Sequence, residues 1–395
     1  MSITNLAARS DAPSLAIGRI QIARNAPGFM AALASAYAEQ CRPRCLCRPG
    51  GIEMYIARHT DGFVVKRMPE TGTQHAPHCP SFEAPAGATG RSALLGTAIR
   101  ENPITGVTAL RLGVPMSQLG HRRTTAQVRA CSQVASSRGA RLSLQGLMHY
   151  LWDEAGLTRW HPGFRGKRSW ALVRSRLLKA AQSTTVNGHP LASRLYVPEM
   201  FSVDQWPTIV ERRSRLWARA QSGGSRSFPL LLLMAEVKAF MPADRAGRLV
   251  IKHMPDLAFL LDEPLMKATL KRFGADLEFW TAVSGLRMVI SATFSINRTG
   301  VPCISALSLM PTNQDWIPVE QAQELQLIQS LQSEARSFIK CLRYDNPLVE
   351  RIASAVLTDC PDGVETLDAD VGHTTSPSRV SQQTGERGLQ LGGSQ

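Results

Sequence analysis

Two pairs of potential metal ligands flank a predicted β-hairpin near the start of this chain, and they constrain its fold more than any other feature. The first pair is Cys45 and Cys47, and the second pair is His75 and Cys79. Between the pairs, two apolar strands over residues 52–68 are joined by a Thr-Asp-Gly turn. One hairpin would bring the two pairs together, which is the topology of a zinc ribbon.

These four side chains suit a structural zinc ion. Thiolate and imidazole are both good zinc ligands, and four protein ligands close a tetrahedral site without an open position for catalysis. A bound ion would also stabilise a small module that has little hydrophobic core. Cys41 and His78 lie beside the two pairs, so the sequence leaves them open as substitute ligands. The alternative is that all of these cysteines are reduced thiols without a metal.

The chain is long enough for several domains, and its composition excludes a wholly disordered protein. It has 395 residues, of which 44% are hydrophobic and 19% are charged. We expect an α+β multidomain protein with segments at 1–85, 90–226 and 228–345 and a disordered tail at 361–395. The absence of a signal segment and of a long apolar run favours the cytoplasm and predicts no membrane span.

Positive charge is concentrated in the middle of the chain. The whole chain has 45 Lys and Arg against 31 Asp and Glu, which gives a net charge of +14. Residues 121–179 hold twelve of these cations and two acids, so their local excess is +10. Such an excess suits nucleic-acid phosphates. Arg richness can also follow from the nucleotide composition of a genome.

The same basic segment predicts two helices and a hairpin. Ser143 is a good N-cap for a helix that Gly156 ends, and a basic helix over 169–181 then precedes a hairpin with an Asn-Gly turn. This order is typical of a winged helix, whose second helix enters the DNA major groove. The alternative is a solvated basic face on a helical bundle. The residues expected to contact nucleic acid are Arg165, Lys167, Arg168, Arg174, Arg176 and Lys179.

The C-terminal segment alternates apolar strands with amphipathic helices. Hairpins are expected over residues 228–254 and 286–309. Helices are expected over 262–273 and 319–338. Two strands and a helix, repeated once, predict an antiparallel α+β domain.

Glu236 and Lys238 on the first of these strands offer an enzymatic alternative. Residues two apart on a strand share a face. A Glu-x-Lys pair is half of a metal-dependent nuclease site, in which the carboxylate holds Mg²⁺ and the lysine steadies the attacking water. Asp256, the acid that would complete the site, follows the pair instead of preceding it. A strand-edge ion pair explains the same residues.

Further motifs accompany the cysteine pairs along the chain. They are Met54–Ala57, Lys66–Pro69, Thr71–Gly72, His149–Gly156, Gly166–Trp170, Leu195–Pro198 and Leu342–Asp345. With the cysteines, they resemble the bacterial family called domain of unknown function 1173, over roughly residues 20 to 360. The chain departs from the family pattern after Cys360. The resemblance implies a bacterial protein, often encoded on mobile elements, and it carries no established activity.

These features predict a zinc-containing protein that binds nucleic acid, with mobile-element DNA as its target. Two alternatives belong to other classes of protein. One is a metal-dependent nuclease that uses Glu236 and Lys238. The other is a protein-interaction scaffold in which zinc and arginine serve partner contacts.

Overall fold

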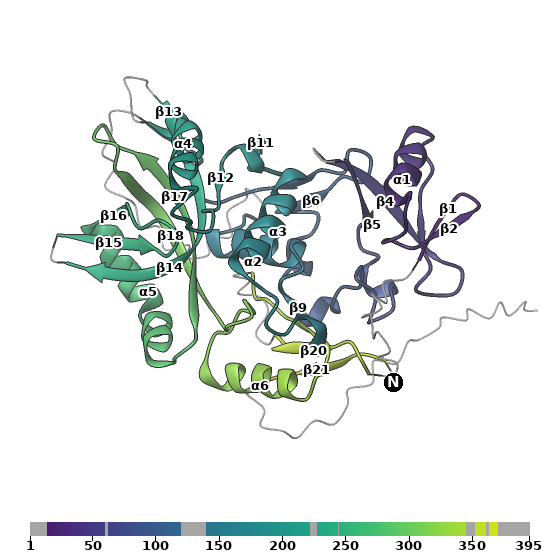
Figure 1. Cartoon of the computed structure of the whole chain (residues 1–395). Coiled ribbons are helices and arrows are strands. Elements are labelled where there is room, and N and C mark those ends of the chain that lie inside the picture. The colour runs from purple at the N-terminus through teal and green to yellow at the C-terminus, as the bar shows by residue number, and fades with distance from the viewer. Residues whose placement is uncertain are drawn as a thin grey trace, which may run out of the picture.

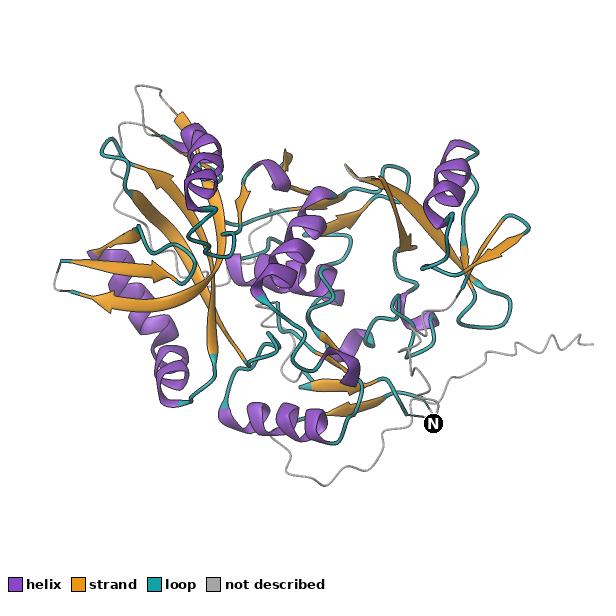
Figure 2. Ribbon diagram, in the orientation of Figure 1, coloured by secondary structure: helices purple, strands orange, loops and turns teal. Residues whose placement is uncertain are grey.

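The computed structural model describes residues 14–59, 62–119, 140–221, 227–243, 245–344, 352–360 and 363–369. It confirms a mixed α+β protein, with six α-helices and several sheets in these ranges. An N-terminal sheet lies at one end and a larger sheet at the opposite end, with helices α2 (Leu144–Glu154) and α3 (Trp170–Gln182) between them (Figures 1 and 2). None of the described helices is long and apolar enough to cross a membrane.

The N-terminal sheet contains the predicted hairpin. Its five strands follow the order β2-β1-β3-β4-β5, and the hairpin pairs Met54 with Arg67 and Ile56 with Val65. Met54 and Ile56 are buried in the core below the sheet, as their alternation predicts. Helix α1 (Phe29–Ala38) packs against β5. The strands are β1 (Leu15–Ile17), β2 (Ile20–Ile22), β3 (Arg44–Cys45), β4 (Ile52–His59) and β5 (Gly62–Arg67).

The middle of the chain follows the predicted order of helix, basic helix and hairpin. The Ser143 hydroxyl accepts a hydrogen bond from the Gly146 N–H at 3.0 Å, and Gly156 ends the helix with φ of +64°. After α3, the predicted hairpin turns at Asn187 and Gly188, which both have positive φ. Its first strand also pairs in parallel with β7, so the hairpin is the edge of a four-stranded sheet. The strands are β6 (Ile99–Glu101), β7 (Thr108–Leu110), β10 (Thr184–Val186) and β11 (His189–Pro190). A winged helix stays a prediction.

The C-terminal sheet closes on itself. Both predicted hairpins form, and β14 pairs with β15 along one edge and with β17 along the other. A strand that the sequence did not predict, β16, completes the ring by contacting β15 and β18. Phe259 and Phe294 meet edge to face inside it, with Trp217 of α4 against both rings. The elements are β12 (Leu195–Tyr196), α4 (Trp206–Trp217), β14 (Leu231–Pro242), β15 (Ala246–Ile251), β16 (Ala258–Asp262), α5 (Glu263–Ala282), β17 (Arg287–Ile296) and β18 (Pro302–Thr312).

Two predicted helix ends are wrong. The helix expected to end at 273 continues as α5 to Ala282, across a kink where Phe273 has φ of −114° and ψ of 15°. The helix expected over 319–338 is shorter, because α6 (Ala322–Ser333) ends before Ala335, which has positive φ. Phe338 instead begins strand β19 and packs with Trp160. Tertiary packing of this phenylalanine overrides its place in the helical pattern.

A separate four-stranded sheet near the end of the described chain connects distant parts of the sequence. Its order is β21-β20-β19-β9, and its strands are β9 (Arg159–Trp160), β19 (Phe338–Lys340), β20 (Ala355–Leu357) and β21 (Glu365–Leu367). Strand β21 lies inside the tail expected at 361–395, of which residues 361–362 and 370–395 lie outside the described ranges. A two-stranded sheet of β8 (Ser117–Leu119) and β13 (Ser227–Pro229) makes a second long-range link.

The hydrophobic cores also cross the segment boundaries that we expected. Ile339, Cys341, Ile352 and Val356 lie in the N-terminal core together with the predicted metal ligands Cys45 and Cys79. The stretch at 83–90, at the boundary between the first two expected segments, is packed, and the N–H of its last residue donates to the Leu342 carbonyl at 3.0 Å. The last part of the described chain therefore completes the first module.

Candidate metal centre

The four predicted ligands meet in one cluster. The Sγ atoms of Cys45 and Cys79 lie 3.7 Å apart. His75 Nδ1 lies 3.3 Å from Cys47 Sγ and 3.6 Å from Cys79 Sγ. All four potential ligand atoms lie within 4.8 Å of one another. The four residues therefore form a group that could hold a metal ion, and the zinc ribbon stays a prediction.

Local backbone structure positions each pair. Cys45 is held in the sheet, where β3 pairs with β1 and β4, and Cys47 follows two residues later. On the other side, a 3-10 turn over Gly72–Gln74 leads directly into His75. Glycine is required at the start of this turn, because a Cβ on Gly72 would lie 2.4 Å from the Cβ of Glu83.

The distances fit a tetrahedral metal ion. Bonds of about 2.3 Å to sulfur and 2.0 Å to nitrogen place two sulfurs about 3.8 Å apart, and a sulfur and a nitrogen about 3.5 Å apart. The observed separations agree with both values. Backbone N–H groups also point at the sulfurs, from Ala76 to Cys47 at 3.5 Å and from Ser81 to Cys79 at 3.4 Å. Such bonds orient the ligands and stabilise thiolates.

The two substitute ligands stay outside the cluster. The group of ligand atoms comprises only Cys45, Cys47, His75 and Cys79 among the described residues. Cys41 is half-buried and His78 is exposed. Among the described residues, the candidate ligand set is therefore Cys45, Cys47, His75 and Cys79.

The cysteines differ in how readily they lose a proton. Hydrogen bonds from the Cys79 thiol and from His75 lower the pKa of Cys45 to about 3, although burial opposes this. The same thiol–thiol bond, together with burial, raises the pKa of Cys79. Burial also raises the pKa of Cys47. Binding of a metal ion would therefore displace protons from the cluster.

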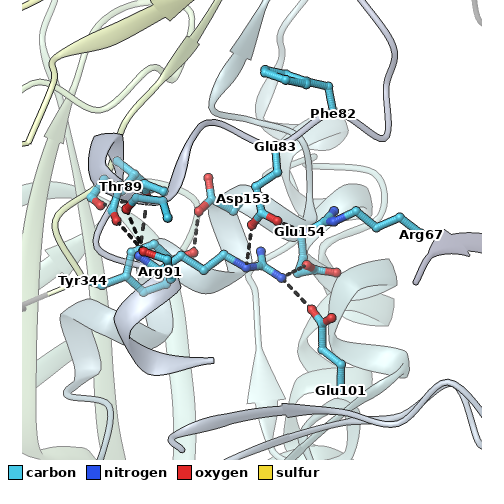
Figure 3. A network of polar contacts seen from close by, with 12 residues as sticks. Arg67, Phe82, Glu83, Thr89, Arg91, Glu101, Asp153, Glu154 and Tyr344 are labelled. Carbon is cyan, nitrogen blue, oxygen red and sulfur yellow. Dashed lines mark hydrogen bonds and ion pairs between the residues drawn. The ribbon is translucent and has the colours of Figure 1, made fainter. Parts of the chain in front are cut away.

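A buried ionic network begins four residues after Cys79. The guanidinium of Arg91, whose side chain is 4% exposed, lies 3.1 Å from Glu83, 2.9 Å from Glu101 and 2.8 Å from Glu154. Figure 3 shows it between the three carboxylates, which come from the segment after the metal ligands, from β6 and from the end of α2. The network thus ties the metal module to the middle of the chain.

Further cations and a tyrosine extend this network. Arg67 lies 3.0 Å from Glu83, and Tyr344 donates a hydrogen bond to Asp153 at the left of Figure 3. Although burial opposes it, Arg91 and other cations lower the pKa of Glu154 to about 2. The sequence analysis missed this network, because its members are spread from residue 67 to residue 344. Only the family motifs around them gave a signal.

Arg168, a predicted nucleic-acid contact, is buried. One of its Nη atoms donates to the carbonyls of Leu157 at 2.8 Å and Asp315 at 3.2 Å. Burial lowers its pKa to about 10. The guanidinium therefore holds three chain segments together instead of facing solvent.

The other five predicted contacts fall into two groups. Arg165, Arg174 and Arg176 donate to backbone carbonyls of neighbouring segments. Arg174 also lies 3.7 Å from the carboxylate of Glu199. Lys167 and Lys179 are exposed, and neither has an ion-pair partner among the described residues. Arg165 donates to the Gln332 carbonyl, Arg174 to the Val197 carbonyl and Arg176 to the Ala155 carbonyl.

The predicted nuclease carboxylates are engaged by cations. Glu236 is buried, and its Oε1 lies 2.7 Å from Lys252 Nζ and 3.0 Å from an Arg287 nitrogen. Lys238 is exposed at an irregularity in the pairing of β14 with β15. Asp256 forms a two-pronged ion pair with a buried arginine of α4. The ion-pair interpretation explains these residues.

The fold and the cluster define a mixed α+β protein with three cysteines and one histidine that could hold a metal ion. The chain belongs to the family described as Protein of unknown function (DUF1173), whose model matches residues 15–386. The resemblance is confirmed, and it extends beyond Cys360, where we expected it to end. No curated protein and no solved structure matches the chain.

Proposed function

We propose that this protein binds nucleic acid through the outer edge of α3, with a structural zinc ion holding its N-terminal module. The observation that carries the proposal is a basic segment without acidic residues. Residues 162–190 contain six Arg or Lys and no Asp or Glu. Phosphates would be attracted to this surface without competition from acids of the same segment.

The exposed edge of α3 has a shape that suits a nucleic-acid backbone. Ala171, Ser175 and Lys179 follow each other at four-residue spacing along α3, Lys167 lies in the turn before the helix, and all four are exposed. The helical part of this edge, from Trp170 to Lys179, spans about 14 Å. Because Ala171 and Ser175 have small side chains, the ammonium groups of Lys167 and Lys179 project farthest from this surface, one at each end. They can contact phosphates on both sides of a groove about 12 Å wide.

The predicted arginines would support this edge from behind. Arg168 and Arg176 use their guanidinium groups to bind the carbonyls of residues 155–159. This fixes α3 against the end of α2. In this proposal the lysines contact phosphates and the arginines position the helix.

Zinc is the metal that best fits the cluster. A set of three cysteines and one histidine at tetrahedral spacing is typical of structural zinc sites. All four positions are filled by protein, so the ion would have no open position for a substrate. Its proposed role is to hold the hairpin and the segment at 75–83 together.

The two other candidate functions have different support. Glu236 and Asp256 are both neutralised by cations, which speaks against the nuclease. A scaffold would use the loop before α4, where Met200, Phe201 and Val203 are exposed apolar side chains. Nucleic-acid binding is preferred, because the acid-free basic segment is larger than this loop.

Fluorescence anisotropy tests the proposal. The full chain is titrated into labelled duplex and single-stranded DNA of about 20 nucleotides, at about 50 and 200 mM salt. Affinity should fall steeply with salt, and the double variant Lys167→Ala/Lys179→Ala should reduce the salt slope by about 2, one for each lost phosphate contact.

The matched control is Lys271→Ala/Arg298→Ala, which removes two exposed cations elsewhere. It changes the net charge equally and should leave the slope near that of the unaltered protein. Equal effects of the two double variants would show that only the overall charge matters, and the proposed edge would be wrong.

A further inference from the structure

A small cavity lies where α2, α5, β18 and β19 meet, and its lining includes none of the four cluster residues and none of the exposed residues of the α3 edge. Its volume is about 160 Å³, and its lining includes Gln145, His149, Arg272, Phe273, Asp276 and Lys340. An apolar cavity of similar size in another protein holds benzene. The volume therefore admits one compact organic molecule.

His149 supplies a hydrogen-bond donor to this cavity. Its side chain is 2% exposed, and its Nδ1 accepts the backbone N–H of Tyr344 at 3.0 Å. The ring is neutral, since burial and the nearby Lys340 lower its pKa to about 3. The proton must then lie on Nε2. None of the described residues accepts a hydrogen bond from that atom.

Lys340 supplies a second buried donor. Its side chain is also 2% exposed, and the ammonium donates to Glu324 Oε1 at 2.8 Å and to the Cys341 carbonyl at 2.6 Å. An ammonium has three N–H groups, so one N–H remains. The described residues give it no acceptor. A buried donor without a partner is costly, and a ligand oxygen would satisfy it.

The rest of the lining combines apolar surface with charges of both signs. Leu309, Val319 and Phe273 form an apolar wall. Arg272 is exposed beside it, with its guanidinium over the Phe273 ring at 5.0 Å. Burial and Glu320 raise the pKa of Asp276 to about 6. These two acids limit how much negative charge the cavity tolerates.

We propose that this cavity binds a small organic monocarboxylate, whose oxygens accept hydrogen bonds from His149 Nε2 and Lys340 Nζ while its apolar body lies against Leu309, Val319 and Phe273. A carboxylate supplies two acceptors for the two buried donors. A phosphate dianion would bring more charge beside Asp276 and leave the apolar wall uncovered. A cation would leave both donors without acceptors.

Calorimetric titration of the full chain with benzoate tests this site. Benzamide and benzylamine are the comparison probes, because they keep the ring and replace the anion by a neutral amide or by a cation. Benzoate should bind at least about tenfold more tightly than either, as expected for hydrogen bonds to a charged acceptor.

The variant His149→Asn tests the contribution of the Nε2 hydrogen-bond donor. Asparagine keeps an acceptor near the position of Nδ1 for Tyr344, and it removes the Nε2 donor. We expect benzoate affinity to fall about tenfold, with the melting temperature measured alongside to show that the variant folds. Lys340 is left unchanged, because its loss would leave Glu324 buried without a partner.

A surface variant keeps the test independent of folding. Arg272→Gln should weaken benzoate binding about threefold by removing a nearby positive charge, whereas the adjacent control Lys271→Gln, outside the lining, should not. The proposal is overturned if benzoate shows no binding up to about 10 mM. It is equally overturned if benzamide or benzylamine binds as tightly as benzoate, or if His149→Asn binds benzoate as the unaltered protein does.

Discussion

Replacing Arg91 with methionine should destabilise the protein more than any other single loss of a cation in the ionic network. Methionine keeps an apolar stem of similar volume, so the change removes mainly the charge. Three carboxylates lie 2.8–3.1 Å from the guanidinium, which is 4% exposed. Breaking a buried ion pair by removing one partner costs about 3–5 kcal/mol, because the other partner stays buried and charged.

The matched control is Arg67→Met. Arg67 is 21% exposed and forms one ion pair of this network, with Glu83 at 3.0 Å. A single, partly exposed pair contributes about 1 kcal/mol or less. Adding Glu154→Gln to Arg91→Met removes one of the stranded carboxylates, so the double variant should recover part of the lost stability.

Urea unfolding measures these differences. The chain has seven tryptophans, whose fluorescence reports the transition. Free energies of unfolding are compared only where fluorescence and circular dichroism give the same transition. If Arg91→Met costs no more than Arg67→Met, the three carboxylates do not depend on Arg91 and our reasoning about the network is refuted.

The pH dependence gives a second test of the same network. The pKa of Glu154 is lowered to about 2 in the folded protein, from its ordinary value of about 4.5. The stability that this carboxylate contributes is therefore present above pH 4.5 and is lost as the pH falls through about 2. The difference in the free energy of unfolding between Arg91→Met and the unaltered protein should become smaller over that interval, since a protonated Glu154 has no charge for Arg91 to neutralise.

Three other outcomes are expected. Purified protein should hold about one equivalent of zinc by elemental analysis, and Cys47→Ser should lose it and melt at lower temperature; a metal-free protein with an unchanged melting temperature would contradict the metal centre. Asp276→Asn should raise the melting temperature near pH 8 and leave it unchanged near pH 4. The pKa of Asp276 is raised to about 6, so the folded state favours the neutral acid and loses stability as the carboxyl ionises. Asparagine stays neutral and avoids that loss. Gly90→Ala should cost about 1–3 kcal/mol in urea unfolding, since its Cβ would lie 2.0 Å from the Arg343 carbonyl oxygen, whereas Gly87→Ala, with open space around it, should be nearly neutral; equal effects would mean that the 83–90 stretch is not packed as described.

Local features of this fold could be predicted because their causes are local. Ser143 and Ser169 cap their helices through bonds to residues three positions away. The Cys/His cluster could be predicted for the same reason, since the two pairs lie on either side of one hairpin. Spacing along the chain was sufficient evidence in each case.

Long-range features could not be predicted from the same patterns. Strand β19 begins at Phe338, which fits a helical pattern, and it becomes a strand because β9 and β20 lie on either side of it. Arg168 looked like a surface cation at the start of a basic helix, yet its guanidinium donates to carbonyls of residues 157–159 and of Asp315, which lies 147 residues away. The Arg91 network joins Glu83 with Glu154, and no local spacing links residues so far apart.

The shared core at the two ends of the described chain has a consequence for synthesis on the ribosome. Ile352 and Val356 complete the core around Cys45 and Cys79, so that core cannot close until nearly the whole chain has been made. At about 5–20 residues per second, the interval from Cys45 to Ile352 takes about 15–60 s. All four metal ligands are synthesised early in this interval, within the first 80 residues. An ion bound at the cluster would therefore stabilise the nascent hairpin during the time before Ile352 and Val356 are synthesised and complete its core.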